Sequence, residues 1–83
     1  MIAVISPLDC KLLWGMARYY LENITPLLIN NKEFKTKDQR LLGFLKLLIY
    51  NGYEIVNVTM FDIKIRNDEQ EEQTISLKYL REL

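Results

Sequence analysis

The residue types that most often perform chemistry are sparse in this chain. It contains no histidine, which excludes Ser-His-Asp and Cys-His catalysis and removes the commonest metal ligand. Its three glycines are scattered and build neither a Walker loop nor a dinucleotide-binding loop. The carboxylates show no pairing of a general acid with a general base. We therefore expect a protein that is not an enzyme and that uses no cofactor and no metal.

Cys10 is the only cysteine, so an internal disulfide and a cysteine-based metal cluster are excluded. A position near the start of a helix can lower a thiol pKa. No base neighbours Cys10 in the sequence, however, and we expect it to be a small buried apolar residue. The first residues, MIAVIS, have no basic region typical of a secretion signal. A lone cysteine without such a signal indicates a cytoplasmic protein.

The segment 67–73, NDEQEEQ, is the sharpest charge feature. Its carboxylates are Asp68, Glu69, Glu71 and Glu72. One interpretation is a solvated hairpin tip that keeps an apolar chain in solution. The other is a negative surface that docks on a basic partner, including a partner site that normally holds nucleic acid.

A basic cluster lies just before the central apolar segment and comprises Lys32, Lys35, Lys37 and Arg40. It surrounds a predicted helix N-terminus, which favours anions, so the cluster is a candidate for phosphate contact. Phe34 lies among these lysines and could stack on a base. The alternative is a solvated turn. The net charge of the chain is zero, which removes the simplest argument for nucleic-acid binding.

The central helix is predicted over residues 37–50, and the basic cluster surrounds its N-terminus. Thr36 and Gln39 have the spacing of a capping box, and Asn51-Gly52 is typical of a helix end. Apolar residues surround this helix, whereas a surface helix shows an apolar arc of roughly 100°. We expect it to be buried against two neighbours, or against one neighbour and another chain. Gly43 marks either a close crossing or a merely tolerated glycine.

The first helix is predicted over residues 7–23, with Ser6 as its N-cap and Pro7 in its first turn. Pro26 kinks or ends it, and a short helical continuation over 27–30 is favoured. The spacing predicts one buried face, formed by Leu13, Met16, Tyr20, Ile24 and Leu27. Because Leu12, Leu13 and Trp14 cannot all face one core, we expect Trp14 or Tyr19 on a partly exposed face, where aromatic residues serve as interface hot spots.

The apolar pattern after the central helix is that of strands. Residues 53–66 alternate but change phase after Met60, which predicts one bent strand or two short ones. Residues 74–79 alternate again and can pair antiparallel with 61–66, with the last few residues helical or frayed. The alternative is a C-terminal helix, because Leu77, Leu80 and Leu83 are spaced by three. Met1–Ile5 is a candidate third strand. The predicted fold class is α+β, with two or three helices followed by an antiparallel hairpin.

The chain of 83 residues is one domain, and 49% of it is hydrophobic, which is much for a monomer of this size. We therefore predict a non-catalytic module that binds another protein and modulates or inhibits it, and that also self-associates as a homodimer or larger homo-oligomer. Its expected partner-binding residues are Trp14, Tyr19, Asp68, Glu69, Glu71 and Glu72. No membrane partner is expected, because the central helix is shorter than the about 20 residues that span a bilayer.

The alternative function is a small transcriptional regulator that binds nucleic acid. Two helices followed by a hairpin resemble a truncated winged helix, and the candidate contacts are Lys32, Phe34, Lys35, Lys37 and Arg40. An acidic loop where a winged helix would carry a basic wing opposes this interpretation. The chain also has two alanines against nine isoleucines. This bias is typical of AT-rich genes, including those of phages, in which case the protein would act in the host cytoplasm.

Overall fold

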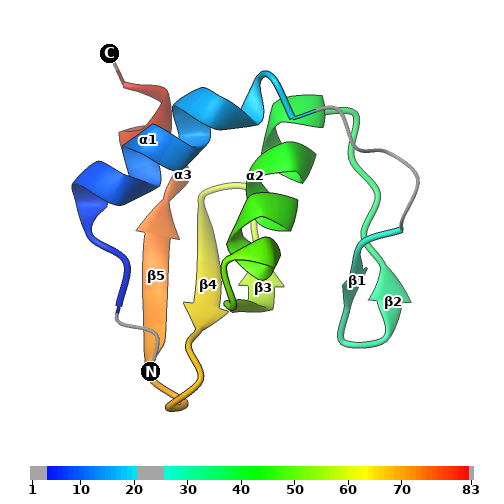
Figure 1. The fold of residues 1–83 in the computed structure, drawn as a ribbon. Coiled ribbons are helices and arrows are strands. Elements are labelled where there is room, and N and C mark those ends of the chain that lie inside the picture. The colour runs from blue at the N-terminus through cyan, green and yellow to red at the C-terminus, as the bar shows by residue number, and fades with distance from the viewer. Residues whose placement is uncertain (1–3, 21–25, 83) are drawn as a thin grey trace.

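The computed structural model describes residues 4–20 and 26–82, and the fold is α+β, as the sequence predicts (Figure 1). Helices cover one face of a three-stranded antiparallel sheet of order β3-β4-β5, and a two-stranded hairpin lies beside the sheet. The elements in chain order are α1 (Pro7–Ala17), β1 (Leu28–Ile29), β2 (Lys32–Glu33), α2 (Gln39–Tyr50), β3 (Glu54–Val58), β4 (Asp62–Arg66), β5 (Glu72–Ser76) and α3 (Leu77–Arg81).

Helix α2 is the buried centre of the fold, which confirms the prediction for residues 37–50. The side chains of Phe44, Leu45 and Leu48 are fully buried. The helix packs against α1 on one side and against β3 on the other. Its end is also as predicted, because Asn51 is the C-cap and Gly52 has a φ of 97°, a left-handed conformation that carries no Cβ penalty for glycine.

The start of α2 differs from the prediction. Asp38, not Thr36, is the N-cap, and its Oδ1 accepts a hydrogen bond from the Leu41 N–H at 3.0 Å. Thr36 lies one turn further out, and its Oγ1 accepts from the Asp38 N–H at 3.0 Å. A carboxylate satisfies the orphan amides and the helix dipole together, so Asp38 is the stronger cap of the two.

Gly43 marks a close crossing of α1 and α2. A Cβ at this position would lie 3.0 Å from the Ala17 carbonyl oxygen and 3.4 Å from that of Tyr20. The backbone of the α1 end therefore rests directly on α2. A larger residue would push the α1 end away by a few tenths of an ångström, which favours the close crossing over a merely tolerated glycine.

Helix α1 begins as predicted, with the Ser6 hydroxyl accepting from the Asp9 N–H at 3.1 Å and Pro7 in the first turn. It ends at Ala17, however, and not near residue 23. The predicted buried face is correct in part, since Leu27 is buried and Leu13 and Tyr20 pack against the core, whereas Met16 is exposed. The fully buried residues of α1 itself are Cys10, Trp14 and Ala17. Ile24, the fourth member of the predicted face, lies outside the described residues. The helix carries apolar residues on two opposite sides, so spacing alone did not identify the inner one.

The helical continuation predicted over residues 27–30 is wrong, because this stretch enters the hairpin β1–β2. Ile29 pairs with Lys32, which leaves Asn30 and Asn31 as a two-residue turn. Both asparagines have positive φ, 53° and 64°. Tight hairpin turns of the primed type require this conformation at both central residues, and asparagine tolerates it.

Residues 53–66 form two short strands, which confirms the second of the two alternatives predicted for this region. The phase change after Met60 is the turn between β3 and β4, and β3 also has a bulge between Ile55 and Asn57. Strand β5 pairs antiparallel with β4 as predicted, but it covers Glu72–Ser76 and not 74–79. Residues 77–79 lie in the short helix α3, which agrees with the helical alternative for the end of the chain. The third strand of the sheet is β3 and not the N-terminal segment. Within that segment residues 1–3 lie outside the described part, and residues 4–6 are not a strand.

Candidate functional site

A stripe of exposed apolar side chains runs along the outer side of α1. It consists of Leu8, Leu12 and Met16, whose spacing of four residues places them on one face of the helix, and of Tyr19 in the turn that follows α1. Their exposed fractions lie between 57% and 78%. The opposite side of α1 carries Cys10, Trp14 and Ala17 and packs into the core. Helix α1 is thus apolar on both its inner and its outer side.

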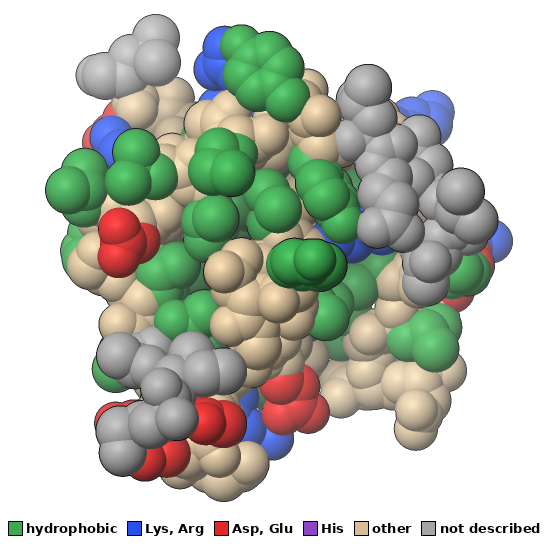
Figure 2. All heavy atoms as spheres, in the orientation of Figure 1, with side chains coloured by type: hydrophobic (Ala, Val, Ile, Leu, Met, Phe, Trp, Pro, Cys, Tyr) green, Lys and Arg blue, Asp and Glu red, His purple; other side chains and the backbone are tan. Residues whose placement is uncertain are grey.

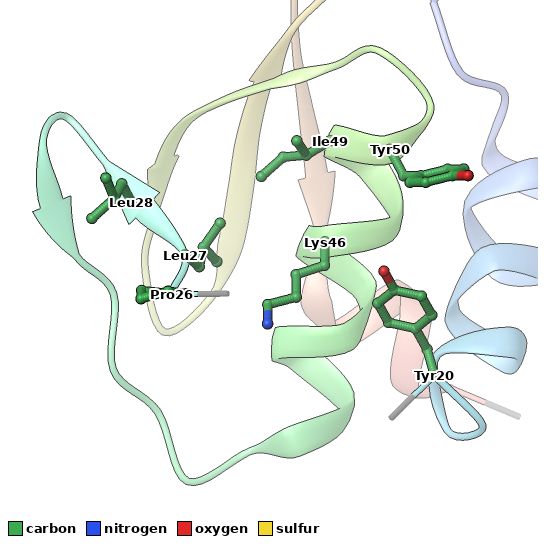
Figure 3. Close-up of a pocket in the computed structure, with 7 residues that line it drawn as sticks. All are labelled: Tyr20, Pro26, Leu27, Leu28, Lys46, Ile49 and Tyr50. Carbon is green, nitrogen blue, oxygen red and sulfur yellow. The ribbon is translucent and has the colours of Figure 1, made fainter. Parts of the chain in front are cut away.

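The exposed surface continues from α1 to the end of α2 through Tyr20. A hollow of about 270 Å³ is lined by Met16, Tyr19, Tyr20 and Leu47. A second hollow of about 370 Å³ shares Tyr20 and lies between α2 and β1 (Figure 3). Its lining residues are Tyr20, Pro26, Leu27, Leu28, Lys46, Ile49 and Tyr50. Lys46 and Ile49 extend from α2 toward β1 in this view, whereas Tyr20 and Tyr50 lie on the side of α1.

We name this continuous surface the outer helical face and define it as Leu8, Leu12, Met16, Tyr19, Ile49 and Tyr50. Figure 2 shows hydrophobic side chains gathered over the two helices that face the viewer. Tyr50 is the most exposed member, at 85%. The described residues thus combine an apolar stripe with two adjoining hollows, which is a shape that accommodates a protein element.

Of the two aromatic residues expected at an interface, the structure exposes one. The prediction that Trp14 or Tyr19 lies on an exposed face is confirmed for Tyr19. Trp14 is only 5% exposed, and its ring meets the Phe44 ring edge-on at a centroid distance of 5.6 Å. Trp14 therefore anchors α1 to α2 and does not present its ring to a partner.

The outer helical face contrasts with the opposite side of the sheet. We name that side the outer sheet face. It consists of residues that pair with one another across the strands and point away from the helices, namely Glu54, Asn57, Lys64, Arg66, Glu72 and Thr74. Arg66 bridges two strands, at 3.2 Å from Glu54 and 2.9 Å from Glu72. The hydrogen bond from Arg66 lowers the pKa of the Glu72 carboxyl. This face is polar, and several of its charges pair with one another.

The predicted acidic loop is the turn between β4 and β5. Its conformation depends on Asn67, which is buried and whose Oδ1 accepts from the Glu69 and Glu71 amides, each at 2.9 Å. Asn67 Nδ2 also donates to Glu71 Oε1 at 2.9 Å. Asp68, Glu69 and Glu71 therefore lie on an ordered turn at one end of the sheet, whereas Glu72 is the first residue of β5 and pairs with Arg66.

The predicted basic cluster does not assemble into one phosphate site. Arg40 does not take part in such a site. Its Nε donates to the Trp14 carbonyl at 2.9 Å, and its guanidinium lies 4.4 Å from the Trp14 ring centroid. Burial lowers the pKa of Arg40, with repulsion from Arg18 adding to the effect. Phe34 is half-buried against the core. Lys32, Lys35 and Lys37 are exposed, and Lys35 lies 3.5 Å from a Glu33 oxygen.

The N-terminus of α2, which the basic cluster was expected to complete as an anion site, is already occupied. Asp38 Oδ1 caps the helix, and Asp38 Oδ2 accepts a hydrogen bond from Arg81 Nη2 at 2.7 Å. An incoming phosphate would have to displace this carboxylate and its partner. The geometry thus favours a structural role for the start of α2.

Cys10 lies in the core, as predicted, and burial raises the pKa of its thiol. Across residues 4–20 and 26–82, no three Cys, Asp or Glu side chains are grouped so that they could hold a metal ion. In the same part of the chain, no helix has the length and apolar character needed to cross a membrane. Comparisons with protein-family models, with curated proteins and with solved structures found no match for this chain.

The sequence reasoning missed most of the outer helical face. The spacing of Leu8, Leu12, Met16 and Tyr19 was visible, but a second apolar spacing in the same helix competed with it. Tyr50 lies at the end of the apolar run of α2. The sequence does not show that only the last turn of this run reaches the surface. Met60 and Phe61 are also exposed, at the turn between β3 and β4. Their alternation in the sequence suggested strand residues, which are usually half-buried.

Proposed function

We propose that this protein is a non-catalytic interaction module that binds another protein through the outer helical face and modulates or inhibits it. The observation that carries this proposal is the exposed apolar stripe on α1, which lies opposite a complete buried face of the same helix. A helix needs one apolar side for its own core. The second side stabilises nothing within the described chain, so a partner is its best explanation.

The size of the outer helical face supports this function. With about 200 Å² for a large side chain, the exposed fractions of its six residues amount to roughly 780 Å². The largest apolar patch on a typical monomer is about 300–600 Å², whereas a stable complex buries about 800 Å² on each partner. The outer helical face is therefore large for a monomer and close to one half of a standard interface.

The proposed partner element is an amphipathic helix. The helical part of the stripe, from Leu8 to Met16, is about 12 Å long at 1.5 Å per residue, which matches about two turns of helix laid along α1. Lys11 and Arg18 flank the stripe on one side, where Lys11 Nζ donates to the Glu82 carbonyl at 3.2 Å, and Asp9 is on the other. A partner helix with acidic side chains beside its apolar stripe complements the two cations.

The acidic turn has a second role in this proposal, which is to steer the encounter. Asp68, Glu69, Glu71 and Glu72 lie at the end of the sheet, and such exposed charges change association rates more than affinities. Self-association is the other way to cover the outer helical face, with a second copy as the partner. No specific observation favours the nucleic-acid alternative, since Arg40 and Phe34 are engaged with the core.

The test is affinity capture from a lysate of the source organism with nuclease present, comparing four proteins. Wild type is expected to retain one protein in stoichiometric amount, and Leu12→Glu with Met16→Glu is expected to lose it. Glu71→Lys with Glu72→Lys should slow capture, whereas Lys35→Glu with Lys37→Glu is the matched charge control and should not. Equal capture by wild type and the Leu12/Met16 variant would refute the proposal. If only the protein itself is captured, the outer helical face is assigned to a homo-oligomer.

A further inference from the structure

The end of α2 holds the only asparagine of the chain that is followed by glycine, in the pair Asn51-Gly52. An asparagine in this setting is prone to deamidation, because glycine has no Cβ to shield its backbone nitrogen from the neighbouring side chain. Every other asparagine precedes a residue with a side chain. Asn51 and Gly52 are both exposed, so water reaches them. Asn51 is therefore the asparagine that we expect to react first in an unfolded chain.

Deamidation of an asparagine needs water as its only co-reactant and proceeds in two steps. In the first step the backbone nitrogen of Gly52 bonds to Cγ of Asn51, the Cγ–Nδ2 bond breaks, and ammonia leaves with the proton of the Gly52 nitrogen. The product is a five-membered succinimide ring. In the second step water opens the ring at one of its two carbonyl carbons, which yields either aspartate or isoaspartate. The isoaspartate form carries an additional methylene group in the main chain.

The folded chain keeps the two reacting groups apart. The Gly52 N–H donates to the Ile49 carbonyl at 2.9 Å, and Asn51 Nδ2 donates to the Leu47 carbonyl at 2.7 Å. Ring closure also requires Cβ of Asn51 and the Gly52 nitrogen to be nearly eclipsed about the Cα–C bond. Asn51 has a φ of −88° and a ψ of 8°, at which the Gly52 nitrogen points away from the Asn51 side chain. The ring therefore forms only after the end of α2 has opened.

The bonds that must open belong to a Schellman motif, the common way to end a helix at a glycine. In this motif the Gly52 N–H bonds the Ile49 carbonyl, and the Tyr53 N–H donates to the Leu48 carbonyl at 3.0 Å. The positive φ of Gly52, 97°, is the conformation that the motif requires. Helix ends open at a lower free energy than the core of a protein. The site is thus closed in the native state and reactive in a locally opened state.

We propose that Asn51 is a latent modification site, which the end of α2 protects and which undergoes hydrolytic deamidation when that end opens. The aspartate product has no N–H to donate to the Leu47 carbonyl, and its charge lies at the negative end of the helix dipole. The isoaspartate product lengthens the main chain before Gly52 and displaces the bonds of the Schellman motif. Either product therefore loosens the last turn of α2. This turn carries Ile49 and Tyr50 of the outer helical face, but the inference concerns this chain alone and does not rest on the function proposed for that face.

The first test follows deamidation of the full-length wild type by peptide mapping with mass spectrometry, in the folded state and in concentrated urea at the same mildly alkaline pH. Asn57 is the internal control, because it is also exposed but precedes Val58. In urea we expect Asn51 to react at least about tenfold faster than Asn57. Folding should slow the reaction of Asn51 at least about tenfold, and this factor should match the hydrogen-exchange protection of the Gly52 amide to within about threefold, because both require the same opening.

The second test measures what the modification does to the helix end. Asn51→Asp reproduces the aspartate product, and Asn51→Ala is the matched control, because both variants lose the bond to the Leu47 carbonyl and only the first adds a charge. We expect the Gly52 amide to be at least about twofold less protected in Asn51→Asp than in Asn51→Ala, and less protected in both than in the wild type. Equal deamidation rates of Asn51 in the folded and the unfolded chain would overturn the inference. Equal protection of Gly52 in the wild type and in Asn51→Asp would overturn it as well.

Discussion

The two outer faces of this molecule flank the same core and yet present opposite kinds of side chain. On the outer sheet face, Arg66 pairs with Glu54 and Glu72 across the strands, and the neighbouring positions are polar. On the outer helical face, the stripe from Leu8 to Tyr19 is apolar. Exposed ion pairs contribute little to stability, so the outer sheet face is suited to water. The outer helical face is suited to contact with protein.

The source of this difference is the distribution of apolar residues within each element. In β4, Ile63 and Ile65 point into the core while Lys64 and Arg66 point out, which is the alternation of a strand with one face in water. In α1 the outward positions are apolar as well. A small fold can therefore keep a face polar, and the apolar outer side of α1 is not a by-product of a limited core. The difference indicates that the two faces have separate roles.

The largest effect we expect comes from charging the outer helical face. Leu12→Glu with Met16→Glu should weaken partner binding or self-association at least about 30-fold, because a central interface side chain is worth about 2 kcal/mol or more. Both positions are exposed, so the free energy of unfolding should change by less than about 0.5 kcal/mol. Titration calorimetry and urea unfolding measure the two quantities. A large loss of stability would show that this face belongs to the core, and the contrast between the two faces would fail.

The next largest effect is expected on the inner side of the helical layer, where α1 crosses α2 at Gly43. Gly43→Ala forces a Cβ to within 3.0 Å of the Ala17 carbonyl oxygen, and we expect a net loss of about 1 kcal/mol despite the better helix propensity of alanine. Gly15→Ala is the matched control, because its Cβ would meet no atom within 4 Å. It should stabilise by up to about 1 kcal/mol. Urea unfolding curves of both variants test the expected order, and a Gly43→Ala protein more stable than wild type would contradict the close crossing.

The smallest effect concerns the ion pairs of the outer sheet face. Arg66 holds the pKa of Glu72 below its ordinary value of 4.5. Unfolded Glu72 therefore binds a proton at a higher pH than folded Glu72, so the contribution of the pair is complete above about pH 4.5 and is lost as the pH falls toward the folded pKa. Arg66→Met should return the Glu72 pKa toward 4.5, as followed by NMR titration of the carboxyl carbon. An unchanged Glu72 pKa in the variant would show that the pair does not form in solution.

The fold class, the buried central helix and the β4–β5 hairpin could be predicted because each depends on a local signal. Asn51-Gly52 ends α2 through a conformation that glycine adopts freely, and Ile63 and Ile65 alternate with charged residues. The hairpin β1–β2 was missed because its turn depends on Asn30 and Asn31 in the left-handed region. Asparagine tolerates this conformation without requiring it, so the sequence alone did not distinguish a primed turn from a helical continuation.

The candidate site was harder to predict from the sequence than the fold, because of the apolar pattern of α1. Its two apolar faces give similar patterns, and the packing contact of its inner side with Gly43 and Phe44 shows which of them faces the core. That contact joins residues far apart in the chain and leaves no local signal. Arg40 was likewise assigned to a basic surface, because nothing near it in the sequence shows that it stacks on Trp14. The acidic turn was predicted correctly as a turn, since its polar run is continuous.

The central claim is that the outer helical face is covered by protein and the outer sheet face is not. The most direct measurement replaces one residue on each face, Leu12 or Lys64, with a photoreactive phenylalanine derivative and irradiates living cells of the source organism. We predict that position 12 gives one adduct of defined mass and that position 64 gives none. Adducts from position 64 alone, or equal sets of adducts from both positions, would contradict the claim.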